Sequence, residues 1–197
     1  MITKAEKTTQ YIIRTVAPIF NKKGYAATSL NDITKAAGLT KGAIYGNFKS
    51  KDEIALKAFK HNTTMVLSRI RQYMDKGNTP LERLLHLVEF YKNYYEFTND
   101  FGGCPIINTA VDAKNTHPAL LQHAQETIAT IENLIAEQIE YGKQIGEIRK
   151  TIPGPVYGKR FYSLIQGAIF MSQTTGKKEY TTDCLNVIID TINQRFK

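Results

Sequence analysis

The sequence predicts an all-α protein of about nine helices, with a three-helix N-terminal domain followed by a larger helical C-terminal domain. Three observations favour this fold class. Apolar residues recur every three or four positions along most of the chain, which is the spacing of one helix face. Ser, Thr or Pro precede several of these runs and Gly follows several, as is usual at helix ends. The chain has 197 residues, of which 42% are hydrophobic, and this is enough for a substantial core.

The N-terminal domain begins with a helix predicted over residues 4–23, whose apolar positions share one face and which Gly24 can end. Two shorter helices are predicted over residues 28–37 and 41–48. Gly38 stands between them, and glycine most readily adopts the left-handed conformation that often follows a helix. Two short helices joined by such a turn form a helix-turn-helix.

Hydroxyl side chains stand at the predicted starts of these helices. Thr28 or Ser29 can accept hydrogen bonds from the first amides of the earlier helix, and Thr40 from those of the later one. Ser50 and Glu53 then form a Ser-x-x-Glu capping box, which predicts that a further helix begins immediately afterwards.

The outer face of the second short helix has unusually small or polar residues. Such a face suits a helix in the DNA major groove, where Lys41 can donate to guanine and Ala43 can contact the thymine methyl group. Tyr45, Asn47 and Lys51 are expected to reach phosphates, and the glycines of the helix permit close approach of the backbone. The candidate DNA-binding residues are Thr28, Thr40, Lys41, Gly42, Ala43, Tyr45, Gly46, Asn47 and Lys51.

Most of the positive charge lies in the N-terminal part of the chain. Residues 1–60 contain eleven Lys or Arg and four Asp or Glu, a net charge of +7 out of +8 for the whole chain. Clustered cations favour nucleic-acid binding, because they displace the counterions around phosphates. A solvated, lysine-rich surface has the same composition, but its coincidence with the helix-turn-helix favours DNA.

The helix after Ser50 contains neither Gly nor Pro over residues 51–74, a length of about 36 Å. It is long enough to leave one domain and enter another. We therefore predict a DNA-binding domain over residues 1–50 and a second helical domain over residues 51–197, with this helix as the connector; the family resemblance given below implies ligand binding and dimerisation for the second domain.

Residues 80–98 are predicted to form a helix that is apolar, and rich in aromatic rings, around much of its circumference. Such a helix is usually buried, but an aromatic wall can also bind a small molecule. A short helix from Pro105 would place Asn108 and Asp112 on one face; alternatively, Asn108 caps a helix and Asp112 is solvated. The candidate ligand-binding residues are Phe90, Tyr94, Phe97, Cys104, Asn108, Asp112, Phe161 and Ile165.

Three further helices are predicted over residues 118–141, 155–174 and 181–196, each with apolar residues at helical spacing for a core or an interface. No stretch approaches the roughly 20 apolar residues of a membrane span, and the N-terminus has no apolar signal segment. We therefore expect a cytoplasmic protein with no membrane partner.

The pattern of Cys and His residues gives little support for catalysis. Cys104 and Cys184 are too few for a disulfide framework or a metal quartet, and His117 and His123 stand six apart, the wrong spacing for a helical metal pair. Cys104 is either a redox-sensing thiol or a small core residue. An enzyme using it with either histidine would lack an oriented base, so we predict no enzyme, no metal and no cofactor.

The sequence from Thr28 to Glu53, TSLxDIxxAAGLTKGAIYxxFxSKDE, resembles the DNA-binding signature of the TetR (tetracycline-repressor-like) family of bacterial regulators. Two positions depart from the usual pattern. Thr34 stands where a small alanine normally packs, and Gly46 stands where many members have an aromatic residue or histidine. The second departure removes whatever contact that side chain would make.

The resemblance implies a homodimer in which the last two helices, here about 155–174 and 181–196, form a four-helix bundle with those of a second subunit. It implies a ligand-responsive transcriptional repressor, released from a palindromic double-stranded DNA operator by a small-molecule effector. The alternative is a ligand-independent architectural DNA-binding protein, in which the aromatic helix is only core. That protein would bind scrambled DNA with unchanged affinity.

Overall fold

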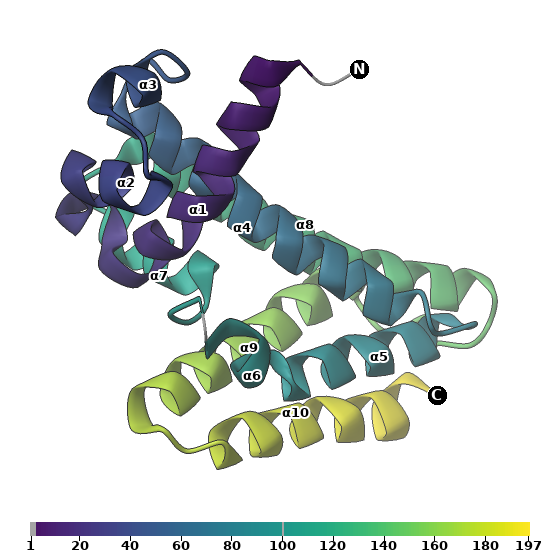
Figure 1. The fold of residues 1–197 in the computed structure, drawn as a ribbon. Helices are drawn as coiled ribbons and strands as arrows, with labels where there is room; N and C mark the ends of the chain where they lie inside the picture. Colours follow the sequence, from purple (N-terminus) through teal and green to yellow (C-terminus); the bar gives the residue numbers. More distant parts are fainter. Residues whose placement is uncertain (1–2, 100) are drawn as a thin grey trace. The chain divides into compact units, whose positions relative to one another are not determined.

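The computed structural model describes residues 3–99 and 101–197. These residues form no β-strand; ten α-helices are followed by one π-helical turn (Figure 1). The all-α fold is confirmed, with one helix more than the nine predicted. The helices are α1 Lys4–Ala27, α2 Leu30–Ala37, α3 Lys41–Tyr45, α4 Lys51–Met74, α5 Pro80–Lys92, α6 Tyr94–Asn99, α7 Pro105–Ala113, α8 Pro118–Gln144, α9 Gly154–Thr175 and α10 Glu179–Thr191, and the π-helical turn is Ile192–Phe196.

The additional helix arises because the helix predicted over residues 80–98 is interrupted. Asn93 leaves the helical conformation at φ −98° and ψ 5°, and its amide donates to the carbonyl groups of Phe90 and Tyr91. The Asn93 side chain donates to the carbonyl oxygen of Glu89 at 3.3 Å. Short polar side chains that bond to nearby backbone in this way compete with a regular helix, and α5 and α6 are separate as a result.

Two other helix boundaries also depart from prediction. Helix α3 ends at Tyr45 rather than Phe48, because Gly46 caps it and glycine propagates a helix poorly. In α1, Gly24 does interrupt the helix, with φ 79° and ψ 168°, but a helical turn resumes and continues to Ala27.

The chain folds into two compact units, and each unit combines two separate stretches of sequence. Residues 3–65 and 101–126 form the first, which we call the head unit. Residues 66–99 and 127–197 form the second, the body unit. Helices α4 and α8 each contribute residues to both. A functional boundary at residue 50 stays a prediction.

The head unit contains two apolar clusters. Helices α1 to α4 share the first, and the start of α4, α7 and the start of α8 share the second. The first cluster consists of Ile12, Val16, Ala17, Ile33, Ala37, Ile44, Phe48, Ile54 and Ala58. Helix α7 also packs along α1 (Figure 1), so a segment distant in sequence completes the head unit.

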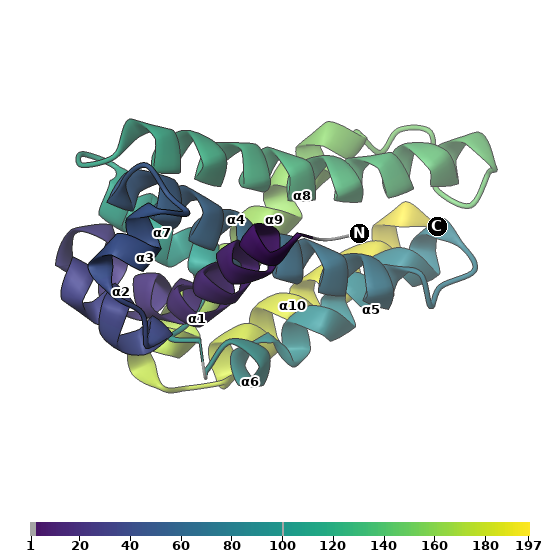
Figure 2. The same cartoon turned by 45° about the horizontal axis from the view of Figure 1, so that its top comes forward.

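In the body unit, α5, α9 and α10 lie side by side (Figures 1 and 2). Phe90 lies at the centre of an aromatic cluster, with its ring centroid 4.9 Å from that of Tyr91 and 5.4 Å from that of Tyr94. A separate cluster joins α9 to the π-helical turn, where the rings of Phe161 and Phe196 stack at 5.8 Å.

Candidate nucleic-acid interface

The turn between α2 and α3 has the geometry that the sequence predicts. Ser29, rather than Thr28, caps α2: its hydroxyl accepts from the amide of Asp32 at 3.1 Å, and the Asp32 carboxylate accepts from the Ser29 amide at 2.8 Å. Gly38 ends α2 in the left-handed region with φ 63°. The Thr40 hydroxyl then accepts from the amide of Ala43 at 3.2 Å and begins α3. These residues form a helix-turn-helix.

Helix α3 has one buried face and one exposed face. Ile44 is completely buried in the head-unit core, whereas Tyr45 is 41% exposed. Lys41 and Gly42 are exposed as well. The face away from the core therefore consists of short or polar residues that a DNA groove can approach.

Besides Thr40, three predicted DNA-binding residues have side chains that interact within the head unit. Thr28 is completely buried, and its hydroxyl donates to the carbonyl oxygen of Gly24 at 2.6 Å. The Asn47 side chain donates to the carbonyl oxygen of Ala43 at 2.9 Å. Lys51 lies over the ring of Tyr25, with its Nζ 4.4 Å from the ring centroid. Their contacts with DNA stay predictions.

Besides the bond from Lys23 to Asp32 described below, two hydrogen bonds join α1 to the helix-turn-helix, and sequence reasoning missed both. Thr9 donates from its hydroxyl to the Asn47 side chain at 3.2 Å, and the Tyr11 hydroxyl donates to the carbonyl oxygen of Ala37 at 3.2 Å. Their partners lie 38 and 26 positions away, so no local pattern could reveal them. These bonds fix α1 against the ends of α2 and α3.

Carboxylates around the helix-turn-helix are held in their charged form. Lys23 donates to Asp32 at 2.6 Å, and this bond, with those from Ser29, lowers the pKa of Asp32. The amide of Lys49, at 2.7 Å, and then Lys57 lower the pKa of Glu53. Such bonds stabilise the starts of α2 and α4, where helix dipoles favour negative charge.

The start of α4 differs in detail from the predicted capping box. The amide of Glu53 donates to the Ser50 hydroxyl at 3.2 Å, as expected. The Glu53 carboxylate, however, accepts from the amide of Lys49 rather than from that of Ser50. The carboxylate reaches one residue further back, and α4 still begins at Lys51.

Tyr25, Asp52 and His117 form a polar cluster beside this start. The Tyr25 hydroxyl donates to Asp52, and this bond raises the pKa of Tyr25 to about 12. The His117 ring meets the Tyr25 ring edge-on, with centroids 4.6 Å apart. Its Nε2 is 4.0 Å from the Asp52 carboxylate and has no hydrogen-bond partner among residues 3–99 and 101–197. The cluster joins α1, α4 and the start of α8.

The predicted ligand-binding residues are divided between the two units. Cys104, Asn108 and Asp112 belong to the head unit, where Cys104 is buried. The Asn108 side chain donates to the carbonyl oxygens of Gly102 at 2.9 Å and Asn21 at 3.2 Å. The Asp112 carboxylate accepts from the amide of Tyr25 at 2.6 Å. Both polar residues thus join α7 to α1, and their role toward a ligand stays a prediction.

The remaining candidates, Phe90, Tyr94, Phe97, Phe161 and Ile165, belong to the body unit. All except the half-buried Phe97 are buried. One cavity that Tyr94 lines has a volume of about 10 Å³. The ligand role of these five residues stays a prediction.

The described parts of the chain also bear on metal and membrane sites. No three His, Cys, Asp or Glu side chains there come together as a metal site would require. Among the same residues, no helix is both long and apolar enough to cross a membrane.

Comparison with known families and proteins extends these observations. The family model "Bacterial regulatory proteins, tetR family" matches residues 12–58, which contain the helix-turn-helix. The model "Tetracyclin repressor-like, C-terminal domain" matches residues 80–188, more than half of the chain.

Similar proteins extend over nearly the whole chain. A TetR-family regulator from Cytophaga hutchinsonii is 34% identical, with 100% of this chain and 98% of that chain covered and a TM-score of 0.92. One from Chloroflexus aurantiacus is 26% identical, with 98% of both chains covered and a TM-score of 0.93. The uncharacterised regulator YxaF of Bacillus subtilis is 27% identical over 169 residues, 85% of each chain. The chain therefore belongs to the TetR family of bacterial regulatory proteins and is a DNA-binding transcriptional regulator.

Proposed function

We propose that the chain is a homodimeric repressor, which binds a palindromic operator through α3 of each subunit and releases it when a small-molecule effector binds. The observation that supports this proposal most directly is the exposed outer face of α3 on a core anchored by Ile44. One such short helix reads few base pairs, so two copies on two half-sites give a specific site.

Within the operator complex, we assign Lys41 and Ala43 to base edges, where they would contact guanine and thymine. Tyr45 and Lys51 would contact phosphates and fix the register. The bonds of Asn47 to Ala43 and Thr9 favour a different role for Asn47: it positions α3 rather than reading DNA.

Exposed apolar residues on α9 and α10 support the dimer. On α9, Leu164 is 38% and Phe170 51% exposed, and on α10 Val187 is 52% exposed. Single exposed apolar residues are ordinary, but several on two adjoining helices are typical of an interface. A symmetric pair of these helices would bury them against their own copies.

The effector proposal depends on the aromatic cluster around Phe90 and Tyr94. A small molecule that binds the body unit only in a conformation that mispositions the head units would lower operator affinity. The decrease equals its differential binding energy, typically about 1–3 kcal/mol.

Selection of bound fragments from random DNA tests the DNA half of the proposal. The expected product is a two-fold symmetric site with half-sites about 34–36 Å apart. Repeating the selection with metabolites from a cell extract tests the effector half. Equal affinity and an equal salt slope on scrambled DNA would instead identify an architectural DNA-binding protein.

Variants of α3 test the assigned contacts on the selected site. Lys41→Ala is expected to relax preference at one base pair by about 1–3 kcal/mol, whereas Tyr45→Ala and Lys51→Ala weaken binding to all sequences alike. If Lys41→Ala leaves every base preference unchanged, the direct-readout role of Lys41 is wrong.

Sedimentation of interface variants tests the dimer. Leu164→Glu combined with Val187→Glu is expected to give monomers at concentrations where the wild type is dimeric, because charges would be buried between subunits. Tyr141→Glu, at an aromatic residue of α8 that is 48% exposed, serves as the control and should leave the dimer intact. A dimer that persists in the double variant would mean that another surface pairs.

A further inference from the structure

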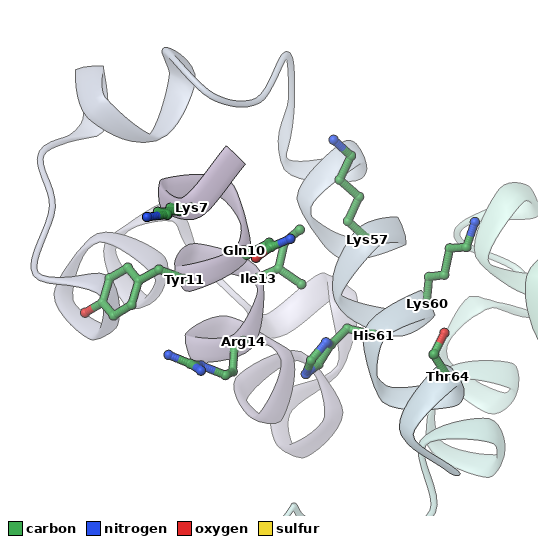
Figure 3. A pocket seen from close by; sticks show the side chains of 9 residues that line it. All are labelled: Lys7, Gln10, Tyr11, Ile13, Arg14, Lys57, Lys60, His61 and Thr64. Atoms are coloured by element: carbon green, nitrogen blue, oxygen red, sulfur yellow. The ribbon is translucent and has the colours of Figure 1, made fainter. Parts of the chain in front are cut away.

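The head unit contains an open groove between α1 and the first half of α4, separate from the outer face of α3. Its volume is about 570 Å³, within the range of small-molecule sites. Residues at helical spacing on both helices line it, as Figure 3 shows, with Gln10 and Ile13 on the side of α1 that faces α4. The lining residues are Lys7, Gln10, Tyr11, Ile13, Arg14, Lys57, Lys60, His61 and Thr64.

The charge around this groove is positive and largely uncompensated. Lys7, Arg14, Lys57 and Lys60 line it, with no Asp or Glu. Lys57 pairs with Glu53 at 2.9 Å. Around Lys7, Arg14 and Lys60, no carboxylate of the described residues lies within 4.0 Å of a side-chain nitrogen. Three cations thus share one concavity without a counter-charge.

His61 lies in the same groove as Arg14. Burial is the main cause that lowers the pKa of the His61 imidazole, and the positive charge of Arg14 adds to it. Only the second cause reflects the positive potential of the groove.

The floor of the groove is apolar. Ile13 lies on the side of α1 that faces α4, and the methylene stems of the lysines add carbon surface around it. A bare inorganic ion would leave this surface exposed, whereas an organic anion with an apolar body would cover it. DNA phosphates are contacted by protruding side chains and backbone amides, so a concave, apolar-floored groove fits a small molecule better.

We propose that the groove between α1 and α4 binds a small organic anion, with an apolar or aromatic body against Ile13 and an acidic group attracted by the cations on both sides of the groove, Arg14 on α1 and Lys60 on α4. The site lies wholly within the head unit and does not need the body unit. It would be a second ligand site, distinct from the effector site proposed in the body unit.

Bound ligand would act on DNA binding through α1, an effect that depends on the proposed function. Tyr11 lines the groove and also donates to the carbonyl oxygen at the end of α2, and Thr9 of the same helix bonds to Asn47 after α3. A ligand that shifts this part of α1 would therefore move the recognition helix. We expect ligand and operator affinities to change reciprocally.

Calorimetric titration without DNA tests the site itself. The probes are naphthalene-1-sulfonate and 1-naphthyl phosphate, which share a naphthalene body and differ in the acidic group, with 1-naphthol as the neutral counterpart of the phosphate. We expect both anions to bind the wild type, and Arg14→Gln with Lys60→Gln to weaken them by about tenfold. Thr64→Phe should also weaken both, because it fills the groove without changing its charge.

A matched control removes the same two charges elsewhere. Arg71→Gln with Lys114→Gln, at exposed positions outside the groove, should change probe affinity by less than about twofold. Wild type that binds neither anion, equal binding of 1-naphthol, or binding that survives both groove variants would each overturn the proposal.

A second titration, with random-sequence DNA, distinguishes the groove from a DNA contact. If Arg14→Gln with Lys60→Gln weakens DNA binding more than the control pair does, and the anions do not bind, the groove holds DNA phosphates and the proposal fails. If the anions bind in the groove but leave operator affinity unchanged, the coupling through α1 is wrong while the site stands. Both results differ from a selection that yields no operator. That outcome would contradict the proposed function and not the groove.

Discussion

Two joints, one in each unit, depend on different chemistry. In the head unit, polar side chains join α7 to elements far apart in sequence: Asn21 and Asn108 bond α1, α7 and the loop before α7, and Asp112 accepts from the amide of Tyr25. In the body unit, aromatic rings pack around Phe90, although polar bonds such as that from the Leu81 amide to Glu147 join distant segments there too. Aromatic packing tolerates rearrangement, whereas each polar joint needs one particular partner. The joint at α7 is therefore more specific than the cluster around Phe90.

The largest effect is expected from removing a ring at the centre of the body unit. Phe90→Ala should lower the free energy of unfolding by about 3–5 kcal/mol, because it deletes a buried ring and leaves a cavity. Urea unfolding followed by near-ultraviolet circular dichroism measures the loss. Tyr141→Ala, at an exposed ring, should stay within about 0.5 kcal/mol of wild type. If Phe90→Ala lowers the free energy of unfolding as little as the control does, the cluster rearranges around the missing ring, as the wall of a ligand pocket would.

A polar joint of the head unit provides the matching test. Asp112→Ala should cost about 1–3 kcal/mol, because the partly buried amide of Tyr25 loses its acceptor. Hydrogen exchange at the Tyr25 amide should accelerate accordingly. Asp112→Asn, which keeps an acceptor oxygen, should restore part of the loss, and Lys114→Ala, on the exposed surface nearby, should change little. Full stability of Asp112→Ala would leave Asp112 available for the ligand role that the sequence predicts.

Local signals predicted most of the fold. The cap at Thr40, the left-handed Gly38 and the limits of α4 depend on neighbours within four residues, and all are present in the structure. Apolar spacing likewise identified the buried faces. The boundaries that differed, at Asn93 and Gly46, are places where one residue ended a helix that the surrounding apolar pattern favoured.

Long-range polar bonds were beyond the reach of the sequence. Asn108 and Asp112 were recognisable as two polar residues on one helix face. That both bond to α1 could not be predicted. The groove between α1 and α4 was missed for the same reason: Arg14 and Lys60 come from helices whose register is set by tertiary packing. In both cases the missing information is which two helix faces meet.

The bond between Thr9 and Asn47 separates positioning from DNA contact. Thr9→Ala should weaken operator binding by about 0.5–1.5 kcal/mol, since it removes one hydrogen bond that orients α3, and Asn47→Ala by at least as much, since it removes that bond and the bond to Ala43. If Asn47 acts through Thr9, the double variant loses no more than the Asn47 variant does. Additive losses in a double-mutant cycle would instead show that Asn47 acts independently of Thr9.

The smallest effect is a pH dependence in the head unit. Burial first, and the charge of Arg14 second, lower the pKa of His61 below its ordinary value of 6.5; Lys7 on α1 and Lys57 and Lys60 on α4 line the same groove. The unfolded chain therefore takes up a proton at a higher pH than the folded head unit does. The stability that neutral His61 contributes is present above about pH 6.5 and is lost as the pH falls from there toward the folded pKa.

His61→Gln should remove this pH dependence, and Arg14→Gln should reduce it by raising the pKa of His61 toward its ordinary value. Urea unfolding of the wild type and both variants at about pH 7.5 and about pH 5.5 measures the difference. Because His61 is largely exposed, solvent screening keeps the effect below those of Phe90 and Asp112. Saturating 1-naphthyl phosphate should raise the pKa of His61 in an NMR titration, since an anion at Arg14 removes the repulsion. A pKa that stays unchanged would mean that the anion binds away from His61, and thus outside the groove.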